Sequence, residues 1–330
     1  MVILAEHVVA ENTLLGHRTK RPEYDLPRAR GDKLELPPLV VGTPAFLENH
    51  QPTVVDLFCG AGGMSLGFES AGFRTVLGVD CDHWASQTFA AHIPAKGIVQ
   101  DLNSITNFRA FFTEYGVHQV TGIIGGPPCQ GFSRVGRGRI RHRDRLKGHT
   151  ELQPDSRNHL YRQYLAAVEA LRPLFFVMEN VPDLDHYEDD DGLLADHIQA
   201  EFERLDYVVD RRILLASDFG VPQNRSRLFF VGFHQSLGKT FCWPDHKAAR
   251  KLYGVQSLRA AIGDLPIVAD GHLARCIPYE VTSESWLHRW YRGGMQEGQE
   301  HLLFDHLTRP HREDDKKVFR GMQEGQVVVR

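Results

Sequence analysis

The cysteine at position 129 has the clearest potential for nucleophilic chemistry in this sequence. It stands in the string Gly125-Gly-Pro-Pro-Cys-Gln-Gly-Phe-Ser133, which follows an apolar run. The two prolines restrict the conformations of this loop. A thiolate in positive surroundings is a strong nucleophile, whereas a cysteine buried among apolar groups is inert. Both interpretations are open from the residues alone, and the rigid loop favours the nucleophile.

Positive surroundings follow directly along the chain. Six arginines and Lys147 crowd into residues 134–147, where Asp144 is the sole acid. Such a segment is either a solvated charged loop or a mobile lid that contacts phosphates. The net charge of the whole chain is −4, so this local concentration of positive charge favours the lid.

Three further side chains are candidates to work with Cys129. Glu179 follows the apolar run 174–178, so a buried strand delivers it, and carboxylates are seldom placed there without a task or a partner. Arg225 and Arg227 precede another apolar run and share one side of an extended chain, because side chains alternate. Structural salt bridges are the alternative for the two arginines.

A glycine-rich turn forms a second candidate site. An apolar run ends at Phe58, and Gly60, Gly62 and Gly63 follow it before a predicted helix. Glycines let the backbone approach a ligand closely, and the start of a helix offers free N–H groups. Asp80 closes the next predicted strand about 20 residues later, which fits hydrogen bonding to ribose hydroxyls.

The ligand of this turn is open from the residues alone. NAD, FAD and S-adenosylmethionine all bind turns of this kind, and a purely structural turn is a further alternative. The dinucleotide fingerprint G-x-G-x-x-G is not met, because Ser65 stands three residues after Gly62. A ligand without a pyrophosphate, such as S-adenosylmethionine, is therefore favoured.

The elements that must position these residues alternate along the chain. Strands are predicted at 53–58, 75–79, 97–99, 121–125 and 174–178, and near 207–215 and 227–233; helices are predicted at 64–71, 84–92, 159–171 and 192–205. This alternation predicts an α/β fold with a mostly parallel sheet that helices cover on both faces. Ligands of such sheets bind at the carboxyl ends of the strands, where the candidate residues fall.

Composition sets the wider limits. The chain has 330 residues, 42% of them hydrophobic and 24% charged, which is typical of a globular protein. It contains no apolar stretch of about 18 residues and no secretory signal, so we expect no membrane association. Its five cysteines include no CxxC pair, which favours a reducing cytoplasm and disfavours a disulfide scaffold or a metal site.

Prolines and the presence or absence of strand–helix alternation divide the chain into three predicted regions. Residues 1–50 contain several prolines and no sustained helical period, so we expect an N-terminal extension. Residues 51–270 carry the alternating strands and helices and form the predicted catalytic domain. Residues 271–330 lack this regular alternation and form a separate third region.

Six strings, taken together and in order, resemble the DNA (cytosine-5)-methyltransferase family over residues 53–266. They are Asp56-Leu-Phe-Cys-Gly-Ala-Gly-Gly63, Gly126-Pro-Pro-Cys-Gln-Gly-Phe-Ser133, Asp155-Ser-Arg157, Glu179-Asn-Val181, Gln223-Asn-Arg-Ser-Arg227 and Ser257-Leu-Arg-Ala-Ala-Ile-Gly-Asp-Leu-Pro266. The resemblance implies a Rossmann-like S-adenosylmethionine-dependent methyltransferase fold. It also implies S-adenosylmethionine as methyl donor and a flipped cytosine in double-stranded DNA as acceptor.

The resemblance further implies roles for the residues around the cytosine. Cys129 would attack C6 of the base, and Glu179 would protonate or hydrogen-bond N3. Arg227, with Arg225, would contact the base carbonyl or keep the surroundings of Cys129 positive. The target atom is inaccessible inside a duplex, so the base must be extruded, and the arginine-rich segment 134–147 would close over it.

Roles in the donor pocket follow from the same resemblance. The residues that would line the donor, bind its ribose, face its adenine amino group or pack nearby are Phe58, Gly60, Gly62, Gly63, Asp80, Asp101 and Pro127. The family often has an aromatic residue directly after the ribose carboxylate. Cys81 stands at this position here, which departs from the pattern for adenine stacking.

The largest departure concerns the C-terminal region. The family continues into a variable DNA-reading region and then a block with a Gly-Asn pair, and no such pair occurs in this sequence. We therefore expect residues 271–330 to be the start of an incomplete target-recognition region, either in a truncated product or with a second chain supplying the rest.

The predicted enzyme belongs to a restriction–modification system and works in the prokaryotic cytoplasm at the nucleoid. The alternatives are an inactive DNA-binding remnant, one half of a split enzyme, an oxidoreductase with a redox-active Cys129, and an enzyme that acts on RNA.

Overall fold

The structure is a computed structural model that describes residues 51–128, 160–189, 192–274, 276–279, 287, 302–304 and 306–322. The predicted N-terminal extension, Cys129 and the arginine-rich segment 134–147 lie outside the described residues. Within the described ranges, the contacts divide the chain into two units, residues 51–256 and residues 257–322. The predicted domain boundaries at 50 and 270 stay predictions. None of the described helices is long and apolar enough to cross a membrane.

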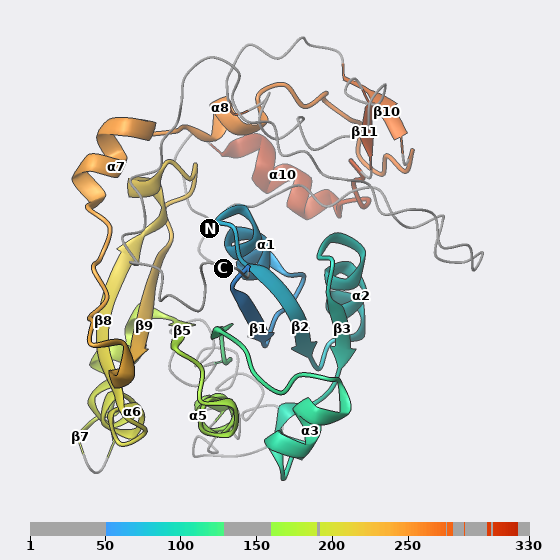
Figure 1. Ribbon diagram of the computed structural model, residues 1–330. Helices are drawn as coiled ribbons and strands as arrows, with labels where there is room; N and C mark the ends of the chain where they lie inside the picture. The colour runs from blue at the N-terminus through green and yellow to red at the C-terminus, as the bar shows by residue number, and fades with distance from the viewer. Residues whose placement is uncertain are drawn as a thin grey trace, which may run out of the picture. The chain divides into compact units, whose positions relative to one another are not determined.

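The first unit is built on a seven-stranded sheet with the order β3-β2-β1-β4-β5-β9-β8 (Figure 1). Its strands are β1 (Thr53–Leu57), β2 (Arg74–Asp80), β3 (Lys96–Val99), β4 (Gly122–Gly125), β5 (Phe175–Asn180), β8 (Tyr207–Leu215) and β9 (Ser226–His234). The strands from β3 to β5 are parallel, and β9 runs antiparallel to both β5 and β8. The prediction of a mostly parallel sheet in an α/β fold is therefore confirmed.

Helices connect these strands, and a further helix, α7, follows β9. They are α1 (Gly63–Ser70), α2 (His83–His92), α3 (Phe108–Glu114), α5 (Leu160–Leu171), α6 (Leu194–Glu203) and α7 (His246–Tyr253), with short 3₁₀ turns η2 (Leu102–Ser104), η4 (Pro182–His186), η5 (Ala216–Phe219) and η6 (Gln235–Leu237). A small hairpin, β6 (Glu188–Asp189) and β7 (Gly192–Leu193), precedes α6. Right-handed crossovers place α1 and α2 on one face of the sheet and α3 and α5 on the other. Helix α5 packs on α3 and on α6.

The local sequence explains these elements. In β1 the four residues after Thr53 are all buried, as expected for a central strand that is covered on both faces. In α5 the buried residues recur at helical spacing and face the sheet. Asp82 caps α2, because its side chain accepts a hydrogen bond from the backbone N–H of Ala85 at 2.9 Å.

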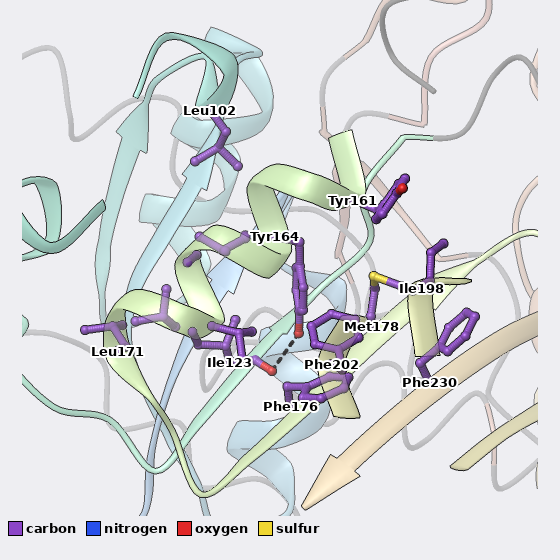
Figure 2. Close-up of a cluster of buried hydrophobic side chains, with 14 of the residues drawn as sticks. Leu102, Ile123, Tyr161, Tyr164, Leu171, Phe176, Met178, Ile198, Phe202 and Phe230 are labelled. Carbon is purple, nitrogen blue, oxygen red and sulfur yellow. Dashed lines mark hydrogen bonds between the residues drawn. The ribbon is translucent and has the colours of Figure 1, made fainter. Parts of the chain in front are cut away.

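The core between α5, α6 and the sheet holds β4 and β5 in place (Figure 2). Tyr164 of α5 is fully buried, and its hydroxyl donates to the carbonyl oxygen of Ile123 at 2.8 Å, shown dashed in Figure 2, and lies 3.0 Å from that of Val177. The rings of Phe176 and Phe202 stack with their centroids 4.1 Å apart. These contacts hold β4, which leads to Cys129, and β5, which carries Glu179, in fixed positions.

The second unit is smaller. It contains α8 (Leu258–Ile262), the antiparallel pair β10 (Cys276–Pro278) and β11 (Leu302–Phe304), and α10 (Glu313–Gly321). Its two ends are fastened together. The backbone N–H of Thr308 donates to the carbonyl of His272 at 2.9 Å, and Lys316 pairs with Asp270 at 2.7 Å.

The sheet topology sets where a ligand can bind. From β1 the chain moves to β2 on one side and later to β4 on the other, so a switch point lies at the carboxyl ends of β1 and β4. Because β9 is antiparallel, the connection from β8 to β9 returns to this same edge. We call this edge, formed by the ends of β1, β2, β4 and β5 with the β8–β9 connection, the carboxyl edge.

Candidate active site

The glycine-rich turn adopts a backbone that L-residues rarely accept. Phe58, Gly60 and Gly62 have φ values of 57°, 53° and 91°, all in the left-handed region. A Cβ at Gly62 would lie 2.9 Å from side-chain atoms of both Phe89 and Ile93 on α2 and its C-terminal cap. The close packing of the α1 start on α2 therefore requires glycine at position 62 and fixes the turn.

Asp80 lies against this turn, as the sequence predicts. Its Oδ2 accepts a hydrogen bond from the backbone N–H of Gly60 at 2.8 Å, and its Oδ1 accepts one from Asp82 at 2.8 Å. A Cβ built at Gly60 would meet no atom within 4 Å, so the space over this residue is open. The structure thus brings Gly60 and Asp80, two residues predicted to bind the methyl donor, into direct contact beside free space.

The other predicted donor residues occupy the same edge. Asp101 follows β3, is exposed, and caps η2 by accepting from the N–H of Asn103 at 2.9 Å. Phe58 packs on the main hydrophobic core, Gly63 begins α1, and Pro127 is buried just after β4. Adjacent strands β2 and β3 place Asp80 and Asp101 on the same side of the switch point.

Contacts with β1 and β5 fix the start of the loop that leads to Cys129. A Cβ at Gly125 would lie 2.2 Å from the carbonyl oxygen of Leu57, so β4 approaches β1 closely here. The side-chain amide of Asn180 donates to the carbonyl of Pro127 at 3.3 Å. Cys129 stands two residues beyond Pro127 and is outside the described part of the chain. Its predicted role stays a prediction.

Glu179 and Arg227 form an ion pair beside this loop. The Glu179 Oε1 lies 2.6 Å from the Arg227 Nε, and each side chain is 19% exposed. Glu179 pairs in register with Phe229, so Arg227 occupies the diagonal position on the same face of the sheet. The other carboxylate oxygen, Oε2, would be 2.9 Å from a Cβ at Gly126. Glycine at 126 therefore lets the carboxylate lie directly against the loop.

Burial controls the electrostatics of this pair. It raises the pKa of Glu179, while the positive charges of Arg227 and Arg225 act in the opposite direction. Burial also lowers the pKa of Arg227, and the charge of Glu179 opposes that shift. The result is a carboxyl group that takes up a proton more readily than an exposed one and lies at hydrogen-bond distance from a cation.

Arg225 has a different setting from Arg227. It precedes β9, is exposed, and its carbonyl accepts from the N–H of Ala216 at 2.9 Å. Its charge nevertheless acts on Glu179. The sequence predicts both arginines near the same site; the structure pairs Arg227 with Glu179 and leaves Arg225 at the surface beside them.

A buried carboxyl that the sequence analysis did not select lies beneath the turn. Asp56 of β1 is 1% exposed, and its Oδ2 accepts from the Ser65 hydroxyl at 2.6 Å. Its Oδ1 has no hydrogen-bond partner among the described residues. Burial raises the pKa of Asp56 to about 7. Burial of Cys59 and the negative charges of the nearby Asp56 and Asp80 raise the pKa of its thiol, so Cys59 stays protonated.

The described side chains also bear on metal binding at this site. Among the residues the structure describes, no three His, Cys, Asp or Glu side chains are grouped so that they could hold a metal ion. The carboxyl edge combines an open glycine turn with an acceptor carboxylate at one end and a half-buried acid–arginine pair at the other. This arrangement suits binding of a nucleoside at the first end and protonation or hydrogen bonding of a polar ring at the second.

Comparison with known proteins agrees with this geometry. The chain is 34% identical over 278 residues to the type II methyltransferase M.DdeI of Desulfomicrobium norvegicum, covering 83% of this chain and 62% of that one. It is 36% identical over 234 residues to the type II methyltransferase M1.HphI of Haemophilus parahaemolyticus, covering 71% and 58%. The chain thus spans about three fifths of the length of these two relatives.

A solved structure shares the fold. A prophage-encoded E. coli protein described as a DNA modification methyltransferase matches with a TM-score of 0.66 at 24% identity, over 83% of this chain and 76% of that one. The sequence profile of the C-5 cytosine-specific DNA methylases matches residues 52–274, which contain the whole carboxyl edge. The chain therefore belongs to the C-5 cytosine-specific DNA methylase family.

Proposed function

We propose that this chain carries the catalytic domain of a restriction–modification DNA (cytosine-5) methyltransferase, which transfers a methyl group from S-adenosylmethionine to C5 of cytosine. The observation that carries the proposal is the Glu179–Arg227 pair, which lies against Gly126 at the start of the loop to Cys129. The family membership and the two type II relatives support the same reaction.

The glycine turn fits the proposed donor. The open space over Gly60 and the left-handed backbone at Phe58, Gly60 and Gly62 allow a nucleoside to approach the main chain. When bound, S-adenosylmethionine supplies an electrophilic methyl group on a sulfonium. Asp80 would hold the ribose hydroxyls, Asp101 would face the adenine amino group, and Pro127 would close the pocket from β4. Phe58 and Gly63 would border the donor at the two ends of the turn.

The acceptor chemistry uses the other end of the carboxyl edge. The Cys129 thiolate would form a bond to C6 of cytosine, and the ring would take a proton at N3 from Glu179. Arg227, with Arg225 beyond it, would stabilise negative charge on the base carbonyl. The C5 carbon, now an enamine carbon, would take the methyl group, and the donor would be left as the thioether S-adenosylhomocysteine. A base would then remove the C5 proton, the C6–S bond would break to release the Cys129 thiolate, and the N3 proton would return to Glu179.

The substrate would be double-stranded DNA with the target base extruded, because C5 and C6 are shielded within the stack. The arginine-rich segment 134–147 would close over the extruded base. Residues 271–330 would contribute the start of the target-recognition region, and a second chain would be one source of the rest. The chain spans about three fifths of the length of its two type II relatives.

Tritiated S-adenosylmethionine and mixed-sequence duplex DNA test the proposal. The chain is incubated with the DNA in excess over long times, and the DNA is then digested to nucleosides. We expect slow accumulation of 5-methylcytosine as the sole labelled nucleoside, and none with Cys129→Ala. Labelled N4-methylcytosine or N6-methyladenine would refute the proposal. Duplex binding without any methylated nucleoside would favour the inactive DNA-binding remnant.

A further inference from the structure

Helix α7 carries a one-sided basic surface. It spans His246–Tyr253, contains no acidic residue, and has no buried residue. At about 100° per residue, its four basic side chains fall within an arc of about 140° on one side of the helix. All four are exposed: His246, Lys247, Arg250 and Lys251. We call these four residues the α7 basic face.

The positive charge of this face is largely uncompensated. Arg250 lies 3.5 Å from Asp218, and both lysines lack an acidic partner among the described residues. The N-cap carboxylate of Asp245 is engaged by the backbone N–H of Lys247 at 2.8 Å. The chain as a whole has 42 acidic and 38 basic residues, so this face is a local departure from its net negative charge.

The fold fixes α7 at the carboxyl edge. The helix packs on η5, in the connection between β8 and β9 (Figure 1). A Cβ at Gly220, whose φ is 77°, would lie 2.6 Å from the Cβ of Tyr253, so helix and connection are in close contact. The same connection carries the exposed Arg225, tied by its carbonyl to Ala216. The α7 basic face and Arg225 therefore belong to one end of the sheet, the end that holds Glu179.

We propose that the α7 basic face, at the end of the sheet that carries Arg225, is a docking surface for the phosphates of duplex DNA that flank the target base. The inference rests on the proposed function, because a duplex must lie across the carboxyl edge to present its base there. Exposed Lys and Arg side chains bind phosphates without reading sequence, and each contact releases counterions. The face would thus set affinity and orientation rather than specificity.

The experiment compares two triple variants with the same change of charge. The first is Lys247→Gln, Arg250→Gln and Lys251→Gln on α7. The control replaces exposed basic residues at the opposite, amino edge of the sheet: Arg74→Gln, Lys96→Gln and Arg204→Gln. Binding of the full chain to a fluorescein-labelled mixed-sequence duplex is measured by anisotropy over a range of salt concentrations.

We expect the log–log salt slope of the α7 variant to be smaller than that of the wild type by about 2–3, and its affinity at 0.1 M salt to fall roughly a hundredfold. The control should stay within about threefold of the wild type. Equal slopes for the two triple variants, or no duplex binding by the wild type, would overturn the inference. If thermal melting shows the α7 triple variant unfolded, Lys251→Gln alone decides, with an expected slope change of about 0.9.

Methyl transfer is measured in parallel, so that the two failures are distinguishable. Without 5-methylcytosine from the wild type, the proposed function fails whatever the slopes are. With 5-methylcytosine and equal slopes, the proposed function holds and the assignment of α7 is wrong.

Discussion

Replacing Asp56 by asparagine removes a carboxyl group from the buried centre of β1, directly beneath the glycine turn. The side chain is 1% exposed, and its Oδ2 accepts a hydrogen bond from the Ser65 hydroxyl. Asparagine keeps the shape and can still accept that bond. It cannot ionise, so the substitution isolates the free-energy cost of burying a negative charge at this position.

The size of the effect follows from the pKa. Burial raises the pKa of Asp56 from 3.8 to about 7, and each unit corresponds to about 1.4 kcal/mol, so full ionisation costs about 4 kcal/mol of stability. A raised pKa in the folded state means that stability is complete below the unfolded-state pKa and is lost as the pH rises through about 7. Between pH 5 and pH 8 the wild type should lose about 2.5 kcal/mol relative to Asp56→Asn.

Urea unfolding of both proteins at several pH values between 5 and 8 measures this difference. At pH 5 the amide nitrogen of Asn, placed where Oδ1 has no partner, should make the variant less stable by about 1–3 kcal/mol. As the pH rises to 8, this deficit should shrink by about 2.5 kcal/mol. Glu114→Gln, which changes an exposed carboxylate at the end of α3, is the matched control and should run parallel to the wild type. Parallel curves for Asp56→Asn would refute the reasoning.

Three further substitutions test other parts of the site. Glu179→Gln removes the proton donor to the base, so single-turnover methyl transfer should slow by about 10²–10⁴ while the dissociation constant of S-adenosylmethionine stays unchanged; a slowing below tenfold would argue against an acid role. Gly62→Ala adds a Cβ 2.9 Å from Phe89 and Ile93 at a φ of 91°, so urea unfolding should show a loss of about 2–3 kcal/mol, and an unchanged midpoint would contradict the packing described. Asp80→Ala removes the acceptor of the Gly60 N–H, so equilibrium dialysis should show donor affinity about tenfold weaker; equal affinity would place the ribose elsewhere.

Much of the sheet could be predicted from the sequence. Each parallel strand is a short run of apolar, often β-branched residues that ends in glycine or a carboxylate, and such runs have few other stable arrangements. Helix α3 is not predicted from the sequence, because its seven residues are too few to show a helical repeat of apolar positions. Its N-cap Asn107, which accepts from the N–H of Ala110 at 3.0 Å, is the signal that could have revealed it.

The residues of the site could be predicted from the sequence, but the contacts between them could not. Glu179 and Arg227 are 48 positions apart, and their approach depends on the antiparallel register of β5 with β9, which no local pattern specifies. Asp56 could not be selected from the sequence, because a single acid within an apolar run resembles an ordinary polar position in a strand. Its importance follows from Ser65, which is brought to it by the packing of α1 on β1.

A covalent trap tests the central claim most directly. Duplex DNA that contains 5-fluorocytosine is mixed with the chain and S-adenosylmethionine, and the products are separated on a denaturing gel. Fluorine at C5 cannot leave as the proton does, so release of Cys129 is blocked after methyl transfer. We predict a DNA–protein adduct with the wild type and none with Cys129→Ala. An adduct that persists in Cys129→Ala, or no adduct from folded, donor-bound wild type, would contradict the account.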